Sequence, residues 1–262
     1  MIRINGISLD QPDKGWTLLP ETEPFAGFES RVDRIDVSGR DGTVPVLGTM
    51  SPTILKARVL CLVGALPALR ALVTSQSIVL TRDDQPNVQA TARFMSSSVD
   101  RAGVAADWLD LTFVFEIPGA FWRSKTERTD SLALTSASVS GQVMPGSTAP
   151  VQDAVIRVIG DVSGLTIRDS SGAWVTFPNN VDGRYTRFEA ATGRCFVAAS
   201  NTWAGGTEVS GQCSFGGPRG VFEIVPVLNA STLASAGSLT ATSTSRSSNA
   251  QVQVRARTAH AI

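Results

Sequence analysis

The sequence predicts a mostly β protein with one short helix, and three observations support this. Most segments alternate apolar and polar residues with a period of two and are separated by Gly, Pro, Asp and Asn, which is typical of strands joined by turns. Helical spacing occurs in a single short segment. In the second half, short strand-like segments recur every 8–12 residues or so, roughly the spacing of a β-sandwich.

A β-hairpin is predicted near the N-terminus. Two alternating segments, Arg31–Val37 and Thr43–Leu47, flank a short polar stretch that contains Arg40, Asp41 and Gly42. The Asp-Gly step supplies the positive φ that a tight hairpin turn requires. We therefore expect Arg40, Asp41 and Gly42 to form the turn.

The remaining elements of the first half follow from the same periodicities. Leucine and valine side chains at spacings of three or four residues predict one helix over residues 66–75. Along the segment Asp107–Ile117, leucine and phenylalanine side chains face one way, so one side of this strand is predicted to be core. Strands are expected at Arg3–Leu9, Ile54–Val63, Ser77–Arg82, Val88–Ser97 and Asp107–Ile117.

A change in composition predicts two domains. Residues 129–150 are mainly Ser, Thr, Gly and Pro with few large side chains, so we place a boundary near residue 130, giving domains 1–130 and 131–262. The second domain is expected to end in a hairpin between Ser238–Ser245 and Gln251–Arg257. Its other predicted strands are Val155–Ile159, Leu165–Arg168, Ala173–Phe177, Arg184–Glu189, Arg194–Ala198, Thr207–Ser210 and Val221–Val227.

Charge and hydropathy argue against two classes of partner. The 262 residues include 23 basic and 23 acidic side chains, so the net charge is zero. Nucleic-acid binding needs a basic face that neutralises phosphates, and we expect none. The longest apolar runs, such as Val59–Leu66 and Phe113–Ile117, are far shorter than the roughly 20 residues that span a bilayer, so no membrane insertion is expected.

The residues available for metal binding and nucleophilic catalysis are few. Cys61, Cys195 and Cys213 are widely spaced, and His260 is the one histidine. Short-spaced zinc ligands and a Ser-His-Asp or Cys-His arrangement are therefore not expected. No glycine-rich phosphate loop follows a strand and opens a helix. We predict no metal, no cofactor, and reduced structural cysteines; the sequence leaves open whether Cys195 approaches Cys213.

Two other functions stay open at this level. A carboxylate-based glycoside hydrolase could use two acidic residues, yet acidic residues that alternate along strands are more often a solvated sheet face. A carbohydrate-binding module could stack a sugar ring on Trp174 or Trp203, which lie in or beside turns of the second domain, although partial burial in the sandwich is the simpler interpretation. The available carboxylates are Asp107, Asp110, Glu116, Glu189 and Glu223.

A series of short motifs resembles the distal tail proteins of siphophages, which form the hub of the tail-tip baseplate. The most specific of them is the turn Ser38-Gly39-Arg40-Asp41-Gly42. The motifs follow one another in the order found in that family and cover most of the chain. They are Ile4-Asn5-Gly6, Trp16, Ser38–Gly42, the strand, helix and strand of Ile54–Arg82, Trp108–Leu111, Phe115–Pro118, Phe121-Trp122, Gly146–Pro150 and Val155–Gly160.

The resemblance implies an N-terminal β-rich tail domain with one short helix, followed by a galectin-like β-sandwich. It also implies a structural virion protein without enzyme activity, located at the virion tail tip and, during assembly, in the host cytoplasm. Its expected partners are itself, in a homohexameric ring, the tail tube protein and a tail-associated hub protein. We hypothesise that Arg40, Asp41 and Gly42 contribute to the ring contact. The alternative is a carbohydrate-binding adhesion module that binds a host cell-surface glycan through Trp174 or Trp203.

Overall fold

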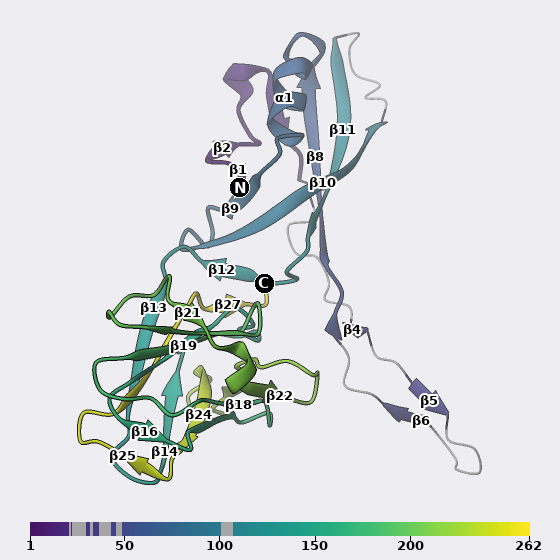
Figure 1. Ribbon diagram of the computed structural model, residues 1–262. Coiled ribbons are helices and arrows are strands. Elements are labelled where there is room, and N and C mark those ends of the chain that lie inside the picture. The colour runs from purple at the N-terminus through teal and green to yellow at the C-terminus, as the bar shows by residue number, and fades with distance from the viewer. Residues whose placement is uncertain (21, 23–29, 32–33, 37–42, 46–48, 101–106) are drawn as a thin grey trace. The chain divides into compact units, whose positions relative to one another are not determined.

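The computed structural model describes the chain except for residues 21, 23–29, 32–33, 37–42, 46–48 and 101–106. The described chain is mostly β, with one α-helix and three short 3₁₀ helices, so the predicted fold class is confirmed (Figure 1). It forms two compact units: an N-terminal unit of Met1–Lys125 with Ile262, and a C-terminal unit of Thr126–Ala261. The predicted boundary near residue 130 falls within a strand of the C-terminal unit, β13 (Arg128–Ala133).

One antiparallel sheet is the centre of the N-terminal unit. A further short strand, β12 (Trp122–Ser124), pairs with Val88 and Gln89 at the start of β10 (Val88–Asp100), the longest strand of this sheet. The sheet order is β2 (Ile7–Ser8), β1 (Ile2–Ile4), β9 (Ile78–Arg82), β10 (Val88–Asp100), β11 (Trp108–Ile117), β8 (Thr53–Leu62) and β3 (Trp16–Leu18).

The predicted single strand over Arg3–Leu9 is wrong. Asn5 and Gly6 have φ values of 51° and 84°, and the chain reverses there, so that β1 and β2 pair with each other. Asparagine and glycine adopt this left-handed conformation more readily than other residues, and Asn-Gly is a strong signal for a two-residue hairpin turn.

The helix and the long strands build the core of the N-terminal unit. Helix α1 (Leu66–Val73) has Pro67 in its first turn and buries Leu69 and Val73 completely. It follows a 3₁₀ turn, η2 (Val63–Ala65), and ends two residues before the predicted position. On β11, Phe113 and Phe115 are buried, which confirms the predicted core side of this strand.

Two short strand pairs occupy the segment between β3 and β8. Strand β4 (Ser30–Arg31) pairs with β7 (Thr49–Met50), and β5 (Arg34–Asp36) pairs with β6 (Thr43–Pro45). The pairing of β5 with β6 agrees with the predicted hairpin. The predicted turn residues Arg40, Asp41 and Gly42 lie outside the described residues.

The C-terminal unit contains two larger sheets. We call them the β13–β21 sheet and the β14–β22 sheet. The first has the order β13, β26 (Gln251–Ala256), β15 (Val155–Ile159), β19 (Tyr185–Glu189), β20 (Arg194–Ala198) and β21 (Thr207–Glu208). The second has the order β14 (Ser138–Val143), β24 (Ser235–Thr242), β17 (Thr166–Asp169), β18 (Trp174–Thr176) and β22 (Ser214–Gly216), with β23 (Pro226–Leu228) also on β24.

A cluster of phenylalanines marks the core of this unit. Phe188 on β19 is fully buried, and its ring lies 6.3 Å from that of Phe177, 6.0 Å from that of Phe222 and 5.3 Å from that of Phe215. These centroid distances are typical of packed aromatic pairs. Because β19 and β22 belong to different sheets, the cluster joins the two layers of the sandwich.

The predicted C-terminal hairpin is wrong, although both of its strands exist. Strand β24 pairs with β14 and β17, whereas β26 pairs with β13 and β15 in the other sheet. Each strand buries one apolar face, Leu239 with Ala241 and Val252 with Val254. Two strands that each bury one face can face each other across a core instead of pairing edge to edge.

Among the described residues, no helix is long and apolar enough to cross a bilayer.

Two further strand predictions need correction. Of the segment Val221–Val227, only the last two residues belong to a strand, where they begin β23, although Phe222, Glu223 and Ile224 are buried. Residues 129–150, for which no strand was predicted, contain most of β13 and all of β14. These two strands consist largely of small and polar residues, so they lack the apolar alternation that identifies a strand in a sequence.

Candidate functional site

In the described part of the chain, one edge of the long strand β10 is without a strand partner along its second half. Its first half, Gln89–Ala92, pairs with β9 on one side, and its second half, Arg93–Asp100, pairs with β11 on the other. Within the described chain, no strand pairs with this second half on the side that β9 occupies. Such an edge presents a row of unpaired backbone donors and acceptors to a strand of another molecule.

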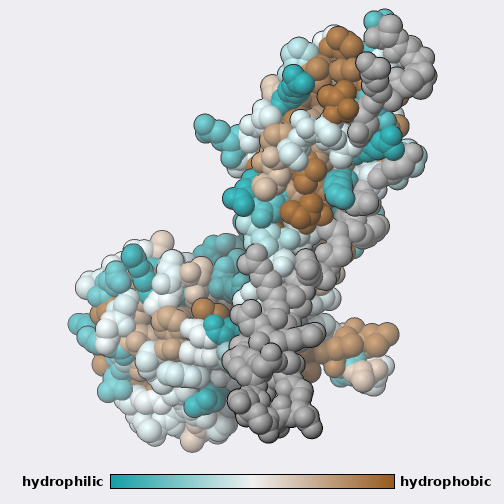
Figure 2. Space-filling view, turned by 90° about the vertical axis from the view of Figure 1, so that its right-hand side faces the viewer, coloured by the Kyte–Doolittle hydropathy of each residue, from teal (hydrophilic) through white to brown (hydrophobic). Residues whose placement is uncertain are grey.

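The side chains of this edge are exposed on both faces of the sheet. Residues 95–99, with the sequence Met-Ser-Ser-Ser-Val, are all exposed. The exposed fraction of Met95 is 49% and that of Val99 is 54%. Figure 2 shows that apolar side chains also gather on part of the surface of the N-terminal unit, in the upper part of the view. The edge therefore combines unpaired backbone with partly apolar side chains, a combination suited to protein contact.

Four of the five acidic residues considered for hydrolysis pair with arginines. On β11, Asp110 accepts hydrogen bonds from Arg58 Nε and Nη2 at 3.0 and 2.6 Å, and Glu116 pairs with Arg93 on the neighbouring strand. In the C-terminal unit, Arg187 pairs with Glu189 and Arg219 pairs with Glu223. An arginine that is hydrogen-bonded to a carboxylate neutralises the carboxylate charge locally, which is a structural role. Among the described residues, no group of three or more His, Cys, Asp or Glu side chains could hold a metal ion.

The two predicted glycan-binding tryptophans lie on different sheets of the sandwich. Trp174 is on β18, opposite Gly216 of β22, where a Cβ atom would come within 3.2 Å of the indole ring. Trp203 is in the loop between β20 and β21, and its ring centroid lies 3.9 Å from Arg157 Cζ and 5.4 Å from Arg255 Cζ. The structure therefore does not bring the two indole rings together into one platform.

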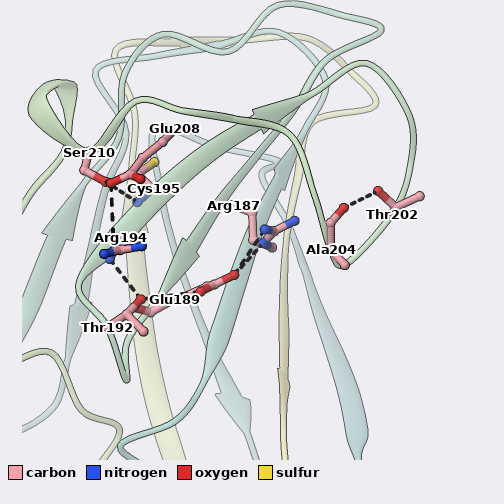
Figure 3. A network of polar contacts seen from close by, with 9 residues as sticks. All are labelled: Arg187, Glu189, Thr192, Arg194, Cys195, Thr202, Ala204, Glu208 and Ser210. Carbon is pink, nitrogen blue, oxygen red and sulfur yellow. Dashed lines mark hydrogen bonds and ion pairs between the residues drawn. The ribbon is translucent and has the colours of Figure 1, made fainter.

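Around the β19–β20 hairpin, a polar network holds one end of the β13–β21 sheet (Figure 3). Glu189 pairs with Arg187, and the Thr192 hydroxyl donates to Glu189 Oε2 at 3.4 Å. Ser210 links the network to the next turn, since its hydroxyl donates to Glu208 at 2.8 Å and accepts from the Cys195 backbone N–H at 3.0 Å. These bonds fix the strands that flank the loop of Trp203.

Cys195 and Cys213 approach each other within the sandwich. Cys195 is fully buried on β20, and the Cys213 thiol donates to the Thr176 carbonyl oxygen at 3.0 Å. A hydrogen bond with the Cys213 thiol, together with burial, raises the pKa of Cys195 well above its ordinary value. Both cysteines are free thiols, in agreement with the prediction.

Arginines on the outer face of the β13–β21 sheet escaped the sequence analysis. Arg157 lies in the middle of the otherwise apolar strand Val155–Ile159, and Arg187 lies opposite it on β19. A single charged residue inside an apolar strand was the signal that could have revealed them, because a buried charge needs a partner.

Comparison with solved structures identifies the fold, whereas comparisons of sequence find no match. No protein-family model matches the chain, and no curated protein matches it in sequence. Among solved structures, the chain is similar to the Dit protein of phage SPP1, described as a paradigm of the hub adsorption apparatus in phages that infect Gram-positive hosts. The two share 12% sequence identity with a TM-score of 0.59, and the similarity covers 98% of each chain.

The chain has a Dit-like fold. The similarity to SPP1 Dit extends through both compact units, so the Dit-like fold includes the N-terminal sheet and the C-terminal sandwich. Two structures of the phage P2 baseplate in its activated conformation, one with Ca and one with Sr, also match at 9% identity over 92% of this chain and 90% of theirs. Their TM-score is 0.35, which is too low to carry weight.

Proposed function

We propose that this chain is a distal tail protein of a long-tailed phage, a structural virion protein that joins the tail tube to the tail-tip hub. The observation that carries the proposal is the similarity to SPP1 Dit over 98% of both chains. A match over the full length of both proteins is stronger support than one shared domain, because single sandwiches serve many unrelated functions. The motifs that resemble siphophage distal tail proteins support the same function.

In this proposal the mechanism is assembly. The N-terminal units form a hexameric ring, a tail tube protein binds one side of the ring and a tail-associated hub protein binds the other. A cyclic ring needs a head-to-tail contact that closes on itself. The exposed edge of β10 at Arg93–Val99 is our candidate for one half of this contact, because added strands bind through backbone hydrogen bonds.

No enzyme activity is part of this function. Of the five carboxylates considered for hydrolysis, four pair with arginines, which supports a structural role. The protein would act at the virion tail tip, after assembly in the host cytoplasm. Light scattering with negative-stain imaging of the purified chain tests the proposal, since a ring is expected to form.

The hairpin of β5 and β6 provides a second proposed ring contact, through Arg40, Asp41 and Gly42. Exchanging the charges, with Arg40→Asp and Asp41→Arg together, is expected to lower the oligomer mass because an opposite-charge contact across the interface would become misaligned. Sedimentation velocity of the double variant beside the natural chain measures this. An unchanged oligomer mass would remove the hairpin from the ring contact and leave the edge of β10 as the candidate.

The alternative function is a carbohydrate-binding adhesion module that acts through the sandwich. One observation favours it: Trp203 is partly exposed and lines a cavity of about 410 Å³ on the C-terminal unit. This alternative predicts that a monomer binds neutral glycans, and that Trp203→Ala abolishes this binding. A glycan array with the natural chain and the variant distinguishes it from the assembly proposal.

A further inference from the structure

Two arginines are buried side by side on the outer face of the β13–β21 sheet. In the strand register, Arg157 of β15 lies opposite Arg187 of β19 on one side and opposite Gln253 of β26 on the other. The exposed fractions of Arg157 and Arg187 are 4% and 3%. Arginine is almost never buried this deeply unless its charge is paired.

The hydrogen-bonding groups of these two side chains are incompletely satisfied. Arg157 Nη2 donates to Gln253 Oε1 at 2.6 Å, while its Nε and Nη1 are buried without a hydrogen-bond partner among the described residues. Arg187 pairs with Glu189 through Nη2 at 3.1 Å, and the described residues offer no acceptor to its buried Nη1 either. Buried donors that lack an acceptor are costly, so a group of them on neighbouring strands indicates a missing acceptor.

Neighbouring positive charges increase the free-energy cost of burying the charged Arg157 guanidinium. Burial lowers the pKa of Arg157; Tyr185 opposes this shift, and the neighbouring charges of Arg255 and Arg187 lower the pKa further. Arg255 is neutralised by an ion pair with Glu127, and Arg187 by Glu189. Among the described residues, the Arg157 guanidinium donates its side-chain hydrogen bond to the neutral amide of Gln253. Arg157 therefore remains a buried cation without an anion among the described residues.

Trp203 covers this cation. Its ring lies 3.9 Å from Arg157 Cζ, and it is carried by a loop whose Gly205 and Gly206 have φ values of 73° and 98°. A side chain at residue 206 would meet the Val197 carbonyl oxygen at 2.8 Å, so this turn requires glycine. Within the loop, the Thr202 hydroxyl donates to the Ala204 carbonyl oxygen at 2.9 Å (Figure 3). The Thr202 N–H likewise donates to the Ser200 carbonyl oxygen within the loop, and the Trp203 ring stacks on Arg157 and Arg255.

The cavity beside Trp203 gives room for a ligand larger than one ion. Its volume is about 410 Å³, and Trp203, Arg255 and Arg257 line it together with Glu127 and Asp153. Arg257 Nε is a further buried donor without a hydrogen-bond partner. A cavity of this size can hold a ligand whose one compact anionic group contacts the arginines while its uncharged remainder lies beside the indole ring.

We propose that Arg157, Arg187 and Trp203 form a binding site for a phosphate group, carried by a small uncharged body such as a sugar. The three unpartnered N–H groups, Nε and Nη1 of Arg157 and Nη1 of Arg187, donate to different phosphate oxygens. A tetrahedral phosphate has several acceptor oxygens and can therefore accept from donors on two strands. Hydrogen bonds from arginine to phosphate are stronger than hydrogen bonds between neutral groups. Trp203 turns aside to admit the phosphate and then packs against the sugar in the cavity.

The test uses the full-length chain and three probes at constant ionic strength: inorganic phosphate, glucose 1-phosphate and glucose. Ligand that binds the folded state raises the melting temperature in a saturable way. We expect saturable shifts with both phosphates, at a lower concentration for glucose 1-phosphate, and no shift with glucose. No saturable shift with either phosphate would overturn the proposal, and an equal shift with glucose would assign the site to neutral sugars.

Variants assign the effect to the arginines. Arg157→Met is expected to weaken phosphate binding at least about tenfold, because two charged hydrogen bonds are lost. Its own melting temperature should not fall, since the variant removes an unpaired buried charge. The matched control is Arg168→Met, at an exposed position on β17 of the other sheet, and it should respond as the natural chain does.

The remaining outcomes are equally decisive. General stabilisation of the folded state by phosphate salts would be the same in Arg157→Met as in the natural chain, and that result would overturn the proposal. If Arg157→Met does not fold, Arg187→Gln removes the third donor from another strand and should also weaken binding. Trp203→Ala should keep the response to inorganic phosphate and lose the preference for glucose 1-phosphate. None of these results depends on ring assembly, so the site can fail while the proposed hub function stands.

Discussion

Replacing Phe188 by alanine is expected to destabilise the C-terminal unit by about 3–5 kcal/mol, the largest stability effect that we predict for a single residue. The phenyl ring is fully buried and packs against Phe177 and Phe222 at nearly perpendicular angles of 82° and 90°. Its removal loses the transfer free energy of the ring, the aromatic contacts and the close packing of two sheets. Differential scanning calorimetry should show this loss in the unfolding of Thr126–Ala261.

A neighbouring phenylalanine provides the matched control. Phe215 also contacts Phe188, at 5.3 Å between ring centroids, but it is 37% exposed. Phe215→Ala should therefore cost only about 1–2 kcal/mol, because less apolar surface leaves the protein interior. If the two variants lost the same stability, Phe188 would not be the centre of the core that joins the two sheets.

Proline in the second half of β10 is expected to abolish the ring. Proline has no backbone N–H, so it removes a donor from whichever side of the strand that donor faces. Ser97 and Ser98 are adjacent and lie opposite Phe113 and Thr112 of β11. Since successive N–H groups of a strand point to opposite edges, one of Ser97→Pro and Ser98→Pro removes a bond to β11, and the other removes an outward donor.

Thermal stability identifies which variant is informative. The proline that faces outward should keep the melting temperature of the natural chain and yet give the mass of a single chain by light scattering. Ser97→Ala and Ser98→Ala are the controls, because they remove the hydroxyl and retain the N–H, and both should form rings. If the variant with natural stability still formed rings, the edge of β10 would not be the subunit contact.

The long elements of the N-terminal unit could be predicted from the sequence because the spacing of their apolar side chains matches the side of each element that is buried. Strand β8 alternates buried and more exposed residues over its whole length, β11 alternates buried and half-buried residues from Leu111 to Phe115, and α1 repeats leucine at helical spacing. The turn at Asn5 and Gly6 was overlooked although its residue types are typical of a hairpin.

The C-terminal unit was harder to predict, for physical reasons. Strands β13 and β14 carry few apolar residues, because they pair along their backbones and bury little of their own side chains. The partners of β24 and β26 could not be inferred from their closeness in the sequence, since each strand joined the sheet on its own side of the core.

The candidate sites depend on contacts between distant residues. The ion pair of Arg58 with Asp110 joins residues 52 positions apart, and only the strand register brings Arg157 and Arg187 together. Trp203 was identified from its sequence context alone, but the arginines beneath it were not. Periodicity predicts which face of a strand is buried, and it does not predict which polar groups on that face remain without a partner.

The most direct test of the hub function is the mass and shape of the purified natural chain in solution. Size-exclusion chromatography with multi-angle light scattering gives the mass, and negative-stain imaging of the same fraction gives the symmetry. The proposal predicts a mass of six chains and annular particles with six-fold symmetry. A mass of one chain at every concentration, with no annular particles, would contradict it.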